Sequence, residues 1–173
     1  MSMMWEYRGQ KRPAFADQPQ AGQESVWDYP RPPRTEAFTE AVEVFTNDTL
    51  VARSVDTLRV LETASPPTIY IPPQDIEMAL FARAVGNSFC EWKGSASYWQ
   101  LVNDPAGMPV AWSYSDPFPA FEKIRDCLCF YPARIACYID GERVQAQAGE
   151  FYGGWVTDAI VGPFKGDPGS GHW

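Results

Sequence analysis

The sequence contains one histidine among 173 residues, and this scarcity argues against several classes of catalytic site. That residue, His172, lies in the run GDPGSGHW. Ser-His-Asp and Cys-His mechanisms need an imidazole held on a rigid scaffold, so we expect neither, and we expect no histidine-ligated metal. The chain also lacks a phosphate-binding loop, a G-x-G-x-x-G run and a zinc-protease motif.

Positive charge and long apolar runs are also scarce. Lys and Arg total 14 against 22 Asp and Glu, which gives a formal net charge of −8. Because nucleic-acid binding depends on a positive surface, we expect no nucleic-acid partner. No apolar run approaches the roughly 20 residues of a spanning helix, and the run MSMMWEYRGQKRP has no signal-peptide core. These features predict a cytoplasmic protein with no membrane partner.

The four cysteines are expected to be free thiols, because the chain shows no secretory signal. Cys127 and Cys129 share one face of an expected strand. Zinc ligands usually have a wider spacing, so we interpret both as small buried side chains, with zinc binding as the less favoured alternative. We expect no metal and no cofactor.

Aromatic residues, proline and glycine are plentiful. Aromatics make up 14% of the chain, and 16 prolines with 13 glycines indicate many turns. This composition favours one compact α+β domain dominated by antiparallel β-sheet, with about eight short strands and one or two short helices. We divide the chain into an extended N-terminal arm (1–35), a core β domain (36–145) and a Gly/Pro-rich C-terminal wrap (146–173).

The arm can lie across its own domain, with Trp27 and Tyr29 as anchors, or present the polyproline-like run YPRPPR to a proline-binding partner. The two terminal segments can also pair two copies of the chain. Within the core, VEVF and LVARS predict a hairpin that turns at Asn47 and Asp48. In TLRVLET, alternation places Val60 and Glu62 on one face.

Three further elements are expected from the sequence pattern alone. Asp75 suits the N-cap of a helix over IEMALFARAV (76–85). A shorter helix is expected at AFEKI, and CLCFYP with RIACYID predicts a hairpin.

The stretch FCEWKGSASYW carries the most informative lysine of the sequence. A plain strand would place Lys93 beside Glu91 on the solvent side, as a weak exposed pair. Alternatively, the chain bends at Gly94 and directs Lys93 into an aromatic-lined pocket. There a lysine can bind an anion, contact a ring face or have its pKa lowered by loss of water.

Other charged residues interrupt apolar runs. Arg53 in VARSV and Glu62 in VLETA predict either an ion pair across neighbouring strands or, for Arg53, a contact with an anionic ligand. Glu62, Asp75 and Asp116 form an acid/base site only if the fold gathers them.

The ordered motifs ESVWDYPRPP, VARSVDTLRVLET, PPTIYIPPQDI, CEWKGSASYW, AWSY and FYP resemble the domain-of-unknown-function 427 family, sometimes labelled nucleotidyltransferase-like. The resemblance runs from about Trp27 to Tyr138 and implies a mostly antiparallel, Mss4-like β domain of bacterial type, without an established activity. Glu91 departs from the family pattern, which has proline there. No carboxylate motif supports the nucleotidyltransferase label.

Three functions follow from these residues. The first is a domain that binds a small anionic or aromatic ligand in a pocket centred on Lys93. The second is an enzyme that uses Lys93 with Glu62 or Asp75, and the third is a non-catalytic protein-interaction module. The candidate ligand-binding residues are Lys93, Arg53, Glu62, Trp92, Tyr98, Trp112, Tyr114, Tyr70 and Asp75.

Overall fold

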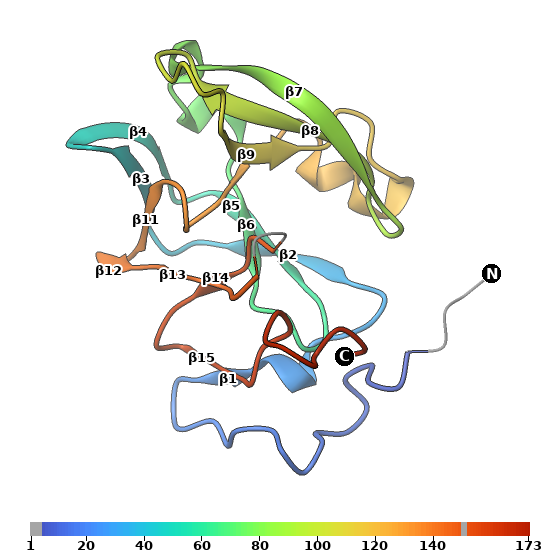
Figure 1. Cartoon of the computed structure of the whole chain (residues 1–173). Coiled ribbons are helices and arrows are strands. Elements are labelled where there is room, and N and C mark those ends of the chain that lie inside the picture. Colours follow the sequence, from blue (N-terminus) through green and yellow to red (C-terminus); the bar gives the residue numbers. More distant parts are fainter. Residues whose placement is uncertain (1–4, 150–151) are drawn as a thin grey trace.

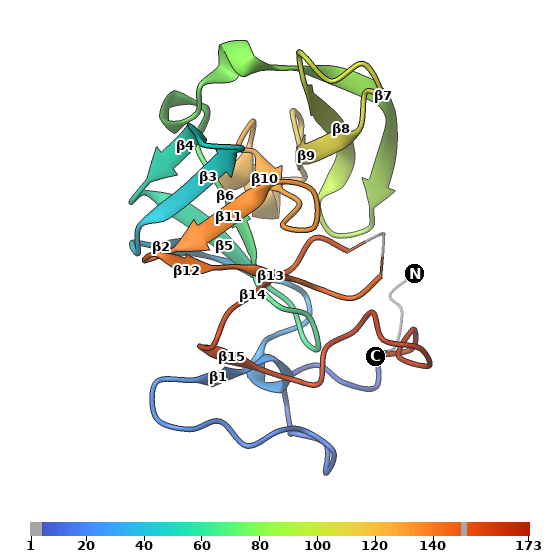
Figure 2. The ribbon, with the colours of Figure 1, turned by 60° about the vertical axis from the view of Figure 1, so that its left-hand side comes forward.

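The computed structural model describes residues 5–149 and 152–173, and its regular structure is mainly antiparallel β-sheet (Figure 1, Figure 2). The predicted fold class is therefore confirmed. Residues 1–4 of the predicted arm and 150–151 of the predicted wrap lie outside the described residues. Within the described ranges, no helix is long and apolar enough to cross a membrane.

One sheet is built on the predicted hairpin. Strands β3 (Val42–Thr46) and β4 (Thr49–Ser54) are antiparallel and turn at Asn47, whose φ of +51° suits asparagine in a tight turn. On the other side of β3 lie β11 (Ala136–Ile139) and β12 (Glu142–Arg143), which gives the order β12-β11-β3-β4.

A three-stranded sheet contributes Ile69 to the main hydrophobic core, and Val60 and Tyr70 to the candidate site described below. Its strands are β2 (Arg34–Phe38), β5 (Thr57–Leu61) and β6 (Thr68–Tyr70), in the order β2-β5-β6. The predicted alternation in β5 holds, because Val60 packs in one buried cluster and Leu61 in another.

A four-stranded sheet supplies most of the aromatic residues of interest. It contains β7 (Phe81–Cys90), β8 (Gly94–Leu101), β9 (Pro109–Ser113) and β10 (Cys129–Phe130), in the order β10-β9-β8-β7. The turn at residues 91–93 joins β7 to β8, so the chain bends just before Gly94 and the plain strand considered for Lys93 is not formed.

The helix predicted over 76–85 is wrong. Two short 3-10 turns, η2 (Pro73–Asp75) and η3 (Met78–Leu80), precede β7, which begins at Phe81. Pairing of Phe81 with Leu101 of β8 outweighs the helical spacing of the apolar residues. Consequently Val85, the last residue of the predicted helix, lies on β7 and is 96% exposed.

The hairpin predicted from CLCFYP and RIACYID is also wrong. Strand β10 pairs with β9, whereas β11 pairs with β3, so these neighbouring segments belong to different sheets. The amide of Ile135 donates to the Tyr131 carbonyl at 3.1 Å in the turn that carries the chain between them. The expected short helix at AFEKI is present as the 3-10 segment η4 (Pro119–Ile124).

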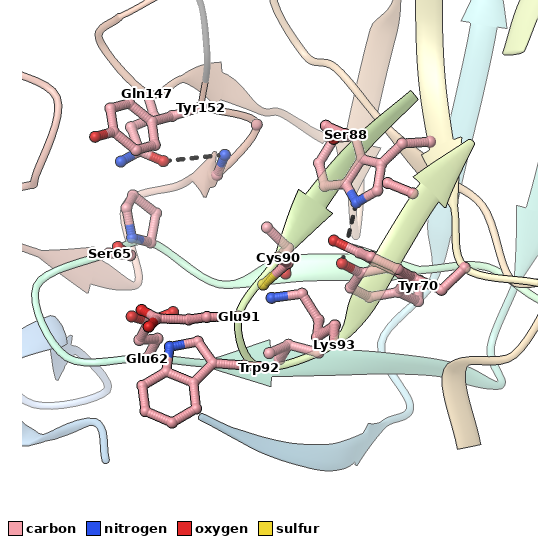
Figure 3. A pocket seen from close by; sticks show the side chains of 18 of the residues that line it. Glu62, Ser65, Tyr70, Ser88, Cys90, Glu91, Trp92, Lys93, Gln147 and Tyr152 are labelled. Carbon is pink, nitrogen blue, oxygen red and sulfur yellow. Dashed lines mark hydrogen bonds between the residues drawn. The ribbon is translucent and has the colours of Figure 1, made fainter. Parts of the chain in front are cut away.

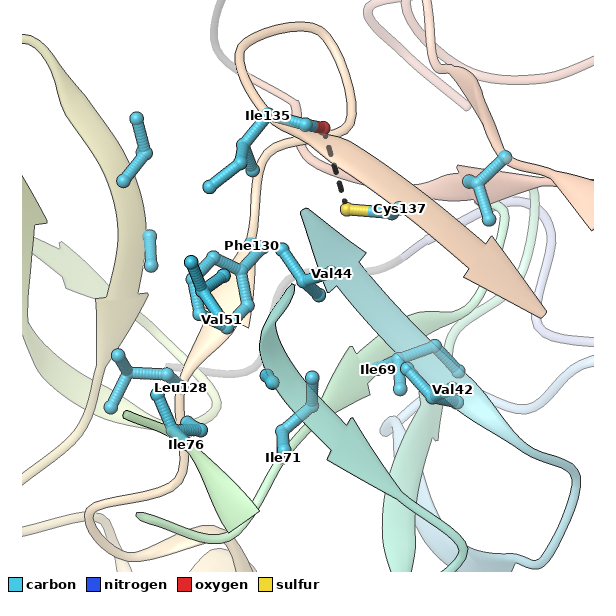
Figure 4. Close-up of a cluster of buried hydrophobic side chains, with 14 of the residues drawn as sticks. Val42, Val44, Val51, Ile69, Ile71, Ile76, Leu128, Phe130, Ile135 and Cys137 are labelled. Carbon is cyan, nitrogen blue, oxygen red and sulfur yellow. Dashed lines mark hydrogen bonds between the residues drawn. The ribbon is translucent and has the colours of Figure 1, made fainter. Parts of the chain in front are cut away.

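The main hydrophobic core draws on all three of these sheets (Figure 4). Val44 and Val51 come from the hairpin sheet, Ile69 from β6, and Phe130 from β10. All four side chains are buried to within 1% of complete. Each such burial contributes roughly 1.5–3 kcal/mol, so this cluster fixes how the sheets pack.

The two terminal segments run side by side (Figure 1, Figure 2). Strand β1 (Glu24–Ser25), which precedes the 3-10 turn η1 (Val26–Asp28), pairs in parallel with β15 (Ile160–Val161). The segment before β15 contains β13 (Gln145–Ala146) and β14 (Trp155–Val156), which pair with each other.

An aromatic cluster holds the terminal segments together. Trp27 is 1% exposed, and its ring lies 5.1–5.2 Å from those of Tyr7, Phe15 and Trp173. Phe15 and Trp173 stack with their ring centroids 5.2 Å apart. These contacts lie within a single chain, and the pairing of two copies through the arms stays a prediction.

Candidate functional site

A cavity of about 290 Å³ is lined by residues from β5, β6, the β7–β8 hairpin, β9 and the C-terminal segment (Figure 3). Its volume is at the lower end of the range for small-molecule sites. Of the nine candidate ligand-binding residues, seven line it: Glu62, Tyr70, Trp92, Lys93, Tyr98, Trp112 and Tyr114. The structure therefore brings together side chains that are far apart in the sequence.

Lys93 is positioned by the turn between β7 and β8. Its carbonyl accepts a hydrogen bond from the Phe118 amide at 3.0 Å, and Gly94 follows with φ +108°, a conformation that favours glycine. The side chain is half-buried and extends into the group of lining residues (Figure 3). Its ammonium lies 6.0 Å from the Tyr114 ring centroid and 5.8 Å from that of Phe121.

The expected alternative of an ion pair between Lys93 and Glu91 is absent from the structure. Across residues 5–149 and 152–173, no carboxylate oxygen lies within 4.0 Å of the Lys93 ammonium. Glu91 is exposed and lines the same cavity. A half-buried cation next to ring faces and without a paired carboxylate is suited to contact an anion.

Hydrogen bonds fix the aromatic walls. The Trp112 indole donates to the Tyr70 hydroxyl at 3.2 Å, which ties β9 to β6. The Tyr98 hydroxyl donates to Ser88 Oγ at 2.7 Å across the β7–β8 hairpin. The rings of Trp112 and Tyr131 lie 4.7 Å apart and tilted. These rings are therefore held in defined orientations around the cavity.

Burial keeps the phenols of the walls neutral. The pKa values of Tyr70, Tyr114 and Tyr131 are all raised, in each case chiefly by burial away from water. Tyrosines with raised pKa values stay protonated at neutral pH. They can accept or donate hydrogen bonds to a ligand, but they do not act as bases.

The C-terminal segment closes against these walls at two glycines. A Cβ on Gly153 would lie 2.3 Å from Trp112 Cη2, so only glycine fits at this distance. A Cβ on Gly154 would lie 2.4 Å from Gln147 Oε1, which accepts the Gly154 amide at 3.1 Å. Figure 3 draws this bond at the side of the cavity that carries Gln147 and Tyr152.

The predicted pair of Arg53 with Glu62 is wrong. Glu62 accepts a hydrogen bond from Arg31 Nε at 3.1 Å, and the Arg31 side chain is only 1% exposed. Arg53 is exposed on β4, opposite Glu43 of β3. Alternation along β4 turns Arg53 to the opposite face from its buried neighbours Ala52 and Ser54.

Two acidic candidates also lie away from the cavity lining. Asp75 accepts a hydrogen bond from Ser54 Oγ at 2.6 Å and so fixes η2 to β4, rather than capping a helix. Asp116 lies beyond β9, where its carboxylate is 3.5 Å from Arg125. Of the three carboxylates considered for acid/base work, only Glu62 lines the cavity.

The cysteines differ in their surroundings. Cys127, Cys129 and Cys137 are buried, and Cys90 is half-buried and lines the cavity. Burial raises the pKa of the Cys127 thiol to about 11. Within the part of the chain that the structure describes, no three His, Cys, Asp or Glu side chains are grouped as a metal site.

Several lining residues were missed by the sequence analysis, notably Lys165, Gln147 and Tyr152 of the C-terminal segment. One local signal could have found Lys165. It stands in Phe-Lys-Gly, and Lys93 stands in Trp-Lys-Gly, so both lysines lie between an aromatic residue and a glycine.

Residues 34–141, more than half of the chain, match the domain of unknown function DUF427. The chain belongs to this family, which confirms the resemblance drawn from its motifs. No curated protein matches the chain. The Mss4-like architecture implied by the resemblance stays a prediction.

Proposed function

We propose that the protein binds a small anionic ligand with an aromatic or planar body in the cavity around Lys93. The observation that carries this proposal is the position of the Lys93 ammonium, half-buried beside the rings of Tyr114 and Phe121. Aromatic walls with a few converging polar groups are typical of small-molecule sites. A cavity beside Lys93 favours this function over an interaction module, which needs no cavity lined by a lysine and aromatic rings.

Catalysis in the same cavity is a second candidate, favoured by one observation. Glu62 lines the cavity together with Lys93, and only one of its two carboxylate oxygens accepts a hydrogen bond from Arg31. Glu62 is thus the acid/base candidate of an enzymatic version, in which Asp75 has no part because it lies against Ser54.

A thermal-shift screen tests the binding proposal. Carboxylates, phosphates and nucleotides with and without aromatic rings would be added to the wild-type chain and to Lys93→Met. A ligand at a hundred times its Kd stabilises by about 2.7 kcal/mol, which raises Tm by roughly 5–10 °C for a chain of this size. Lys123→Met is the matched control, because Lys123 is exposed on η4 and lies outside the cavity lining.

We expect ligands that stabilise the wild-type and Lys123→Met proteins and fail to stabilise Lys93→Met. If hits act equally on Lys93→Met, the anion is not held by this lysine and the proposal is wrong. Turnover of a hit, followed by its loss in Glu62→Gln with binding retained, would establish the enzymatic version.

A further inference from the structure

Two of the chain's four lysines line the same cavity. Lys93 comes from the β7–β8 turn, and Lys165 comes from the C-terminal segment, outside the matched residues 34–141. The formal charge of the whole chain is −8, so its overall field repels anions. Glu62 and Glu91 line the cavity too, but Glu62 is bound to Arg31. Among the described residues, neither lysine ammonium has an Asp or Glu oxygen within 4.0 Å, so both can pair with the charge of a ligand.

The two lysines share a local structure as well as a sequence pattern. The glycine after each has a positive φ, +108° at Gly94 and +118° at Gly166. A Cβ on Gly166 would lie 2.1 Å from the Ala148 carbonyl oxygen, so the backbone after Lys165 is tightly packed. In both places a glycine permits the turn that leaves the preceding lysine among the lining residues.

Hydrogen bonds anchor the backbone of Lys165. Its amide donates to the Ala64 carbonyl at 2.8 Å, and its carbonyl accepts a hydrogen bond from the Gln147 side chain. The Lys165 ammonium lies 4.9 Å from the Trp5 ring centroid and 3.4 Å from the main-chain oxygen of Trp173. A side chain that starts from a fixed backbone can contact a ligand at a small entropic cost.

Lys165 has no Asp or Glu partner within the described ranges. In the described residues no Asp or Glu oxygen lies within 4.0 Å of its ammonium, and the nearby Glu62 is bound to Arg31. Burial, followed by the charge of Arg31, lowers the pKa of Lys165, and these effects exceed the opposing influence of Glu62 and Glu91. An anion at this position would oppose both effects, because it stabilises the charged form of the lysine.

We propose that Lys165 is a second anion contact, and that the ligand carries two separate acidic groups, one held by Lys93 and one by Lys165. The aromatic walls then contact a planar body between the two groups. This inference rests on the proposed function and narrows its ligand to a class, the planar dianions with an acidic group at each end.

Two probe compounds distinguish a site that holds one acidic group of the ligand from a site that holds two. Benzoate carries one carboxylate on an aromatic ring, and terephthalate carries two at opposite ends of the same ring. Calorimetric titration of the full chain should give a Kd for terephthalate about tenfold lower than for benzoate, the usual size of a charge-assisted hydrogen bond. Lys165→Met should remove this preference, Lys93→Met should weaken both probes, and Lys123→Met should change neither.

The proton balance gives a second readout. Since an anion raises the lowered pKa of Lys165, terephthalate binding should take up more protons as the pH rises toward the ordinary lysine pKa of about 10.4. This uptake is measured as a dependence of the binding enthalpy on buffer ionisation. Lys165→Arg keeps a permanent charge, so it should retain the preference for terephthalate and lose the proton uptake. This variant also distinguishes a lost contact from misfolding in Lys165→Met.

The possible failures are distinct. If both probes bind through Lys93 and Lys165→Met leaves their ratio unchanged, the second anion contact is wrong and the proposed function stands. If neither probe binds the wild-type chain at millimolar concentration, or if both bind equally well to Lys93→Met, the proposed function fails together with this inference.

Discussion

The guanidinium of Arg31 donates a hydrogen bond of 2.7 Å to the main-chain oxygen of Trp173, which joins two residues 142 positions apart. The same side chain donates to the Tyr7 carbonyl and to Glu62, and it lies 4.1 Å from the Trp5 ring centroid. One buried arginine thus links both terminal segments to the end of β5 and to the cavity lining.

Replacing Arg31 should destabilise the whole fold. Removal of one partner of a buried ion pair typically costs about 3–5 kcal/mol, and because Glu62 keeps partial access to water we expect about 3 kcal/mol for Arg31→Met. Urea denaturation followed by tryptophan fluorescence measures this change. Arg53→Met is the control, since Arg53 is exposed and its loss should change the free energy of unfolding by less than about 0.5 kcal/mol. Equal stabilities of the two variants would refute the linking role.

Gly153 should tolerate no side chain. A Cβ there would lie 2.3 and 2.5 Å from two carbons of the Trp112 ring, so Gly153→Ala has to displace the ring or the segment. Overpacking of this kind costs about 1–3 kcal/mol. Gly171→Ala is a matched control, because nothing lies within 4 Å of its Cβ position. Chemical denaturation of both variants measures the change in the free energy of unfolding. A Gly153→Ala protein as stable as Gly171→Ala would contradict the close packing.

Part of the fold and of the candidate site could be predicted from residues that are close together in the sequence. The aromatic neighbours of Lys93 and the glycine after it indicated an aromatic-lined pocket as one of two alternatives for this lysine. The hairpin at Asn47 and the alternation in β5 were readable for the same reason, since each depends on residues close in the chain. The local sequence pattern therefore predicted some of the strands and one part of the site.

The remaining features depend on contacts between distant segments. The partner of Glu62 is Arg31 from the arm, and no spacing rule selects it over Arg53. The apolar residues after Asp75 have helical spacing, yet pairing with β8 makes them a strand. Lys165 joins the cavity only because its segment packs against Ala64 and Gln147. Tertiary packing determines these ion pairs, strand pairings and cavity contacts, and it outweighs local propensity.

The stability of the arm should depend on pH through Glu24. Arg59 donates to both oxygens of Glu24 at 2.8 Å, and this hydrogen bonding lowers the Glu24 pKa despite partial burial. A carboxylate with a lowered folded-state pKa stabilises the protein above its unfolded pKa of about 4.3, and this stabilisation is lost as the pH falls through the folded value.

The corresponding measurement compares Glu24→Gln with the wild-type chain across pH. We expect the variant to be less stable at pH 7 and the difference to shrink below about pH 4. Glu77→Gln serves as the control, because Glu77 is exposed and makes no ion pair within the described ranges. A difference that stays constant from pH 7 to pH 3 would show that the Glu24 charge has no part in it.

Cys90 should be the first thiol of the native protein to react. It is half-buried in the cavity lining, whereas the other three cysteines are buried. Burial also raises the pKa values of Cys127, Cys129 and Cys137, which lowers the fraction of reactive thiolate. A chromogenic aromatic disulfide at pH 8 should therefore modify one thiol quickly and the others only after unfolding.

The Cys90 reaction also reports on the cavity. Cys90→Ala should abolish the fast phase and Cys127→Ala should leave it intact. A ligand identified in the thermal-shift screen should slow the fast phase in proportion to its occupancy, because it would cover the thiol that lines the same cavity as Lys93. If a saturating ligand leaves the rate unchanged, that ligand stabilises the protein from another surface. Its site would then have to be sought outside the Lys93 cavity.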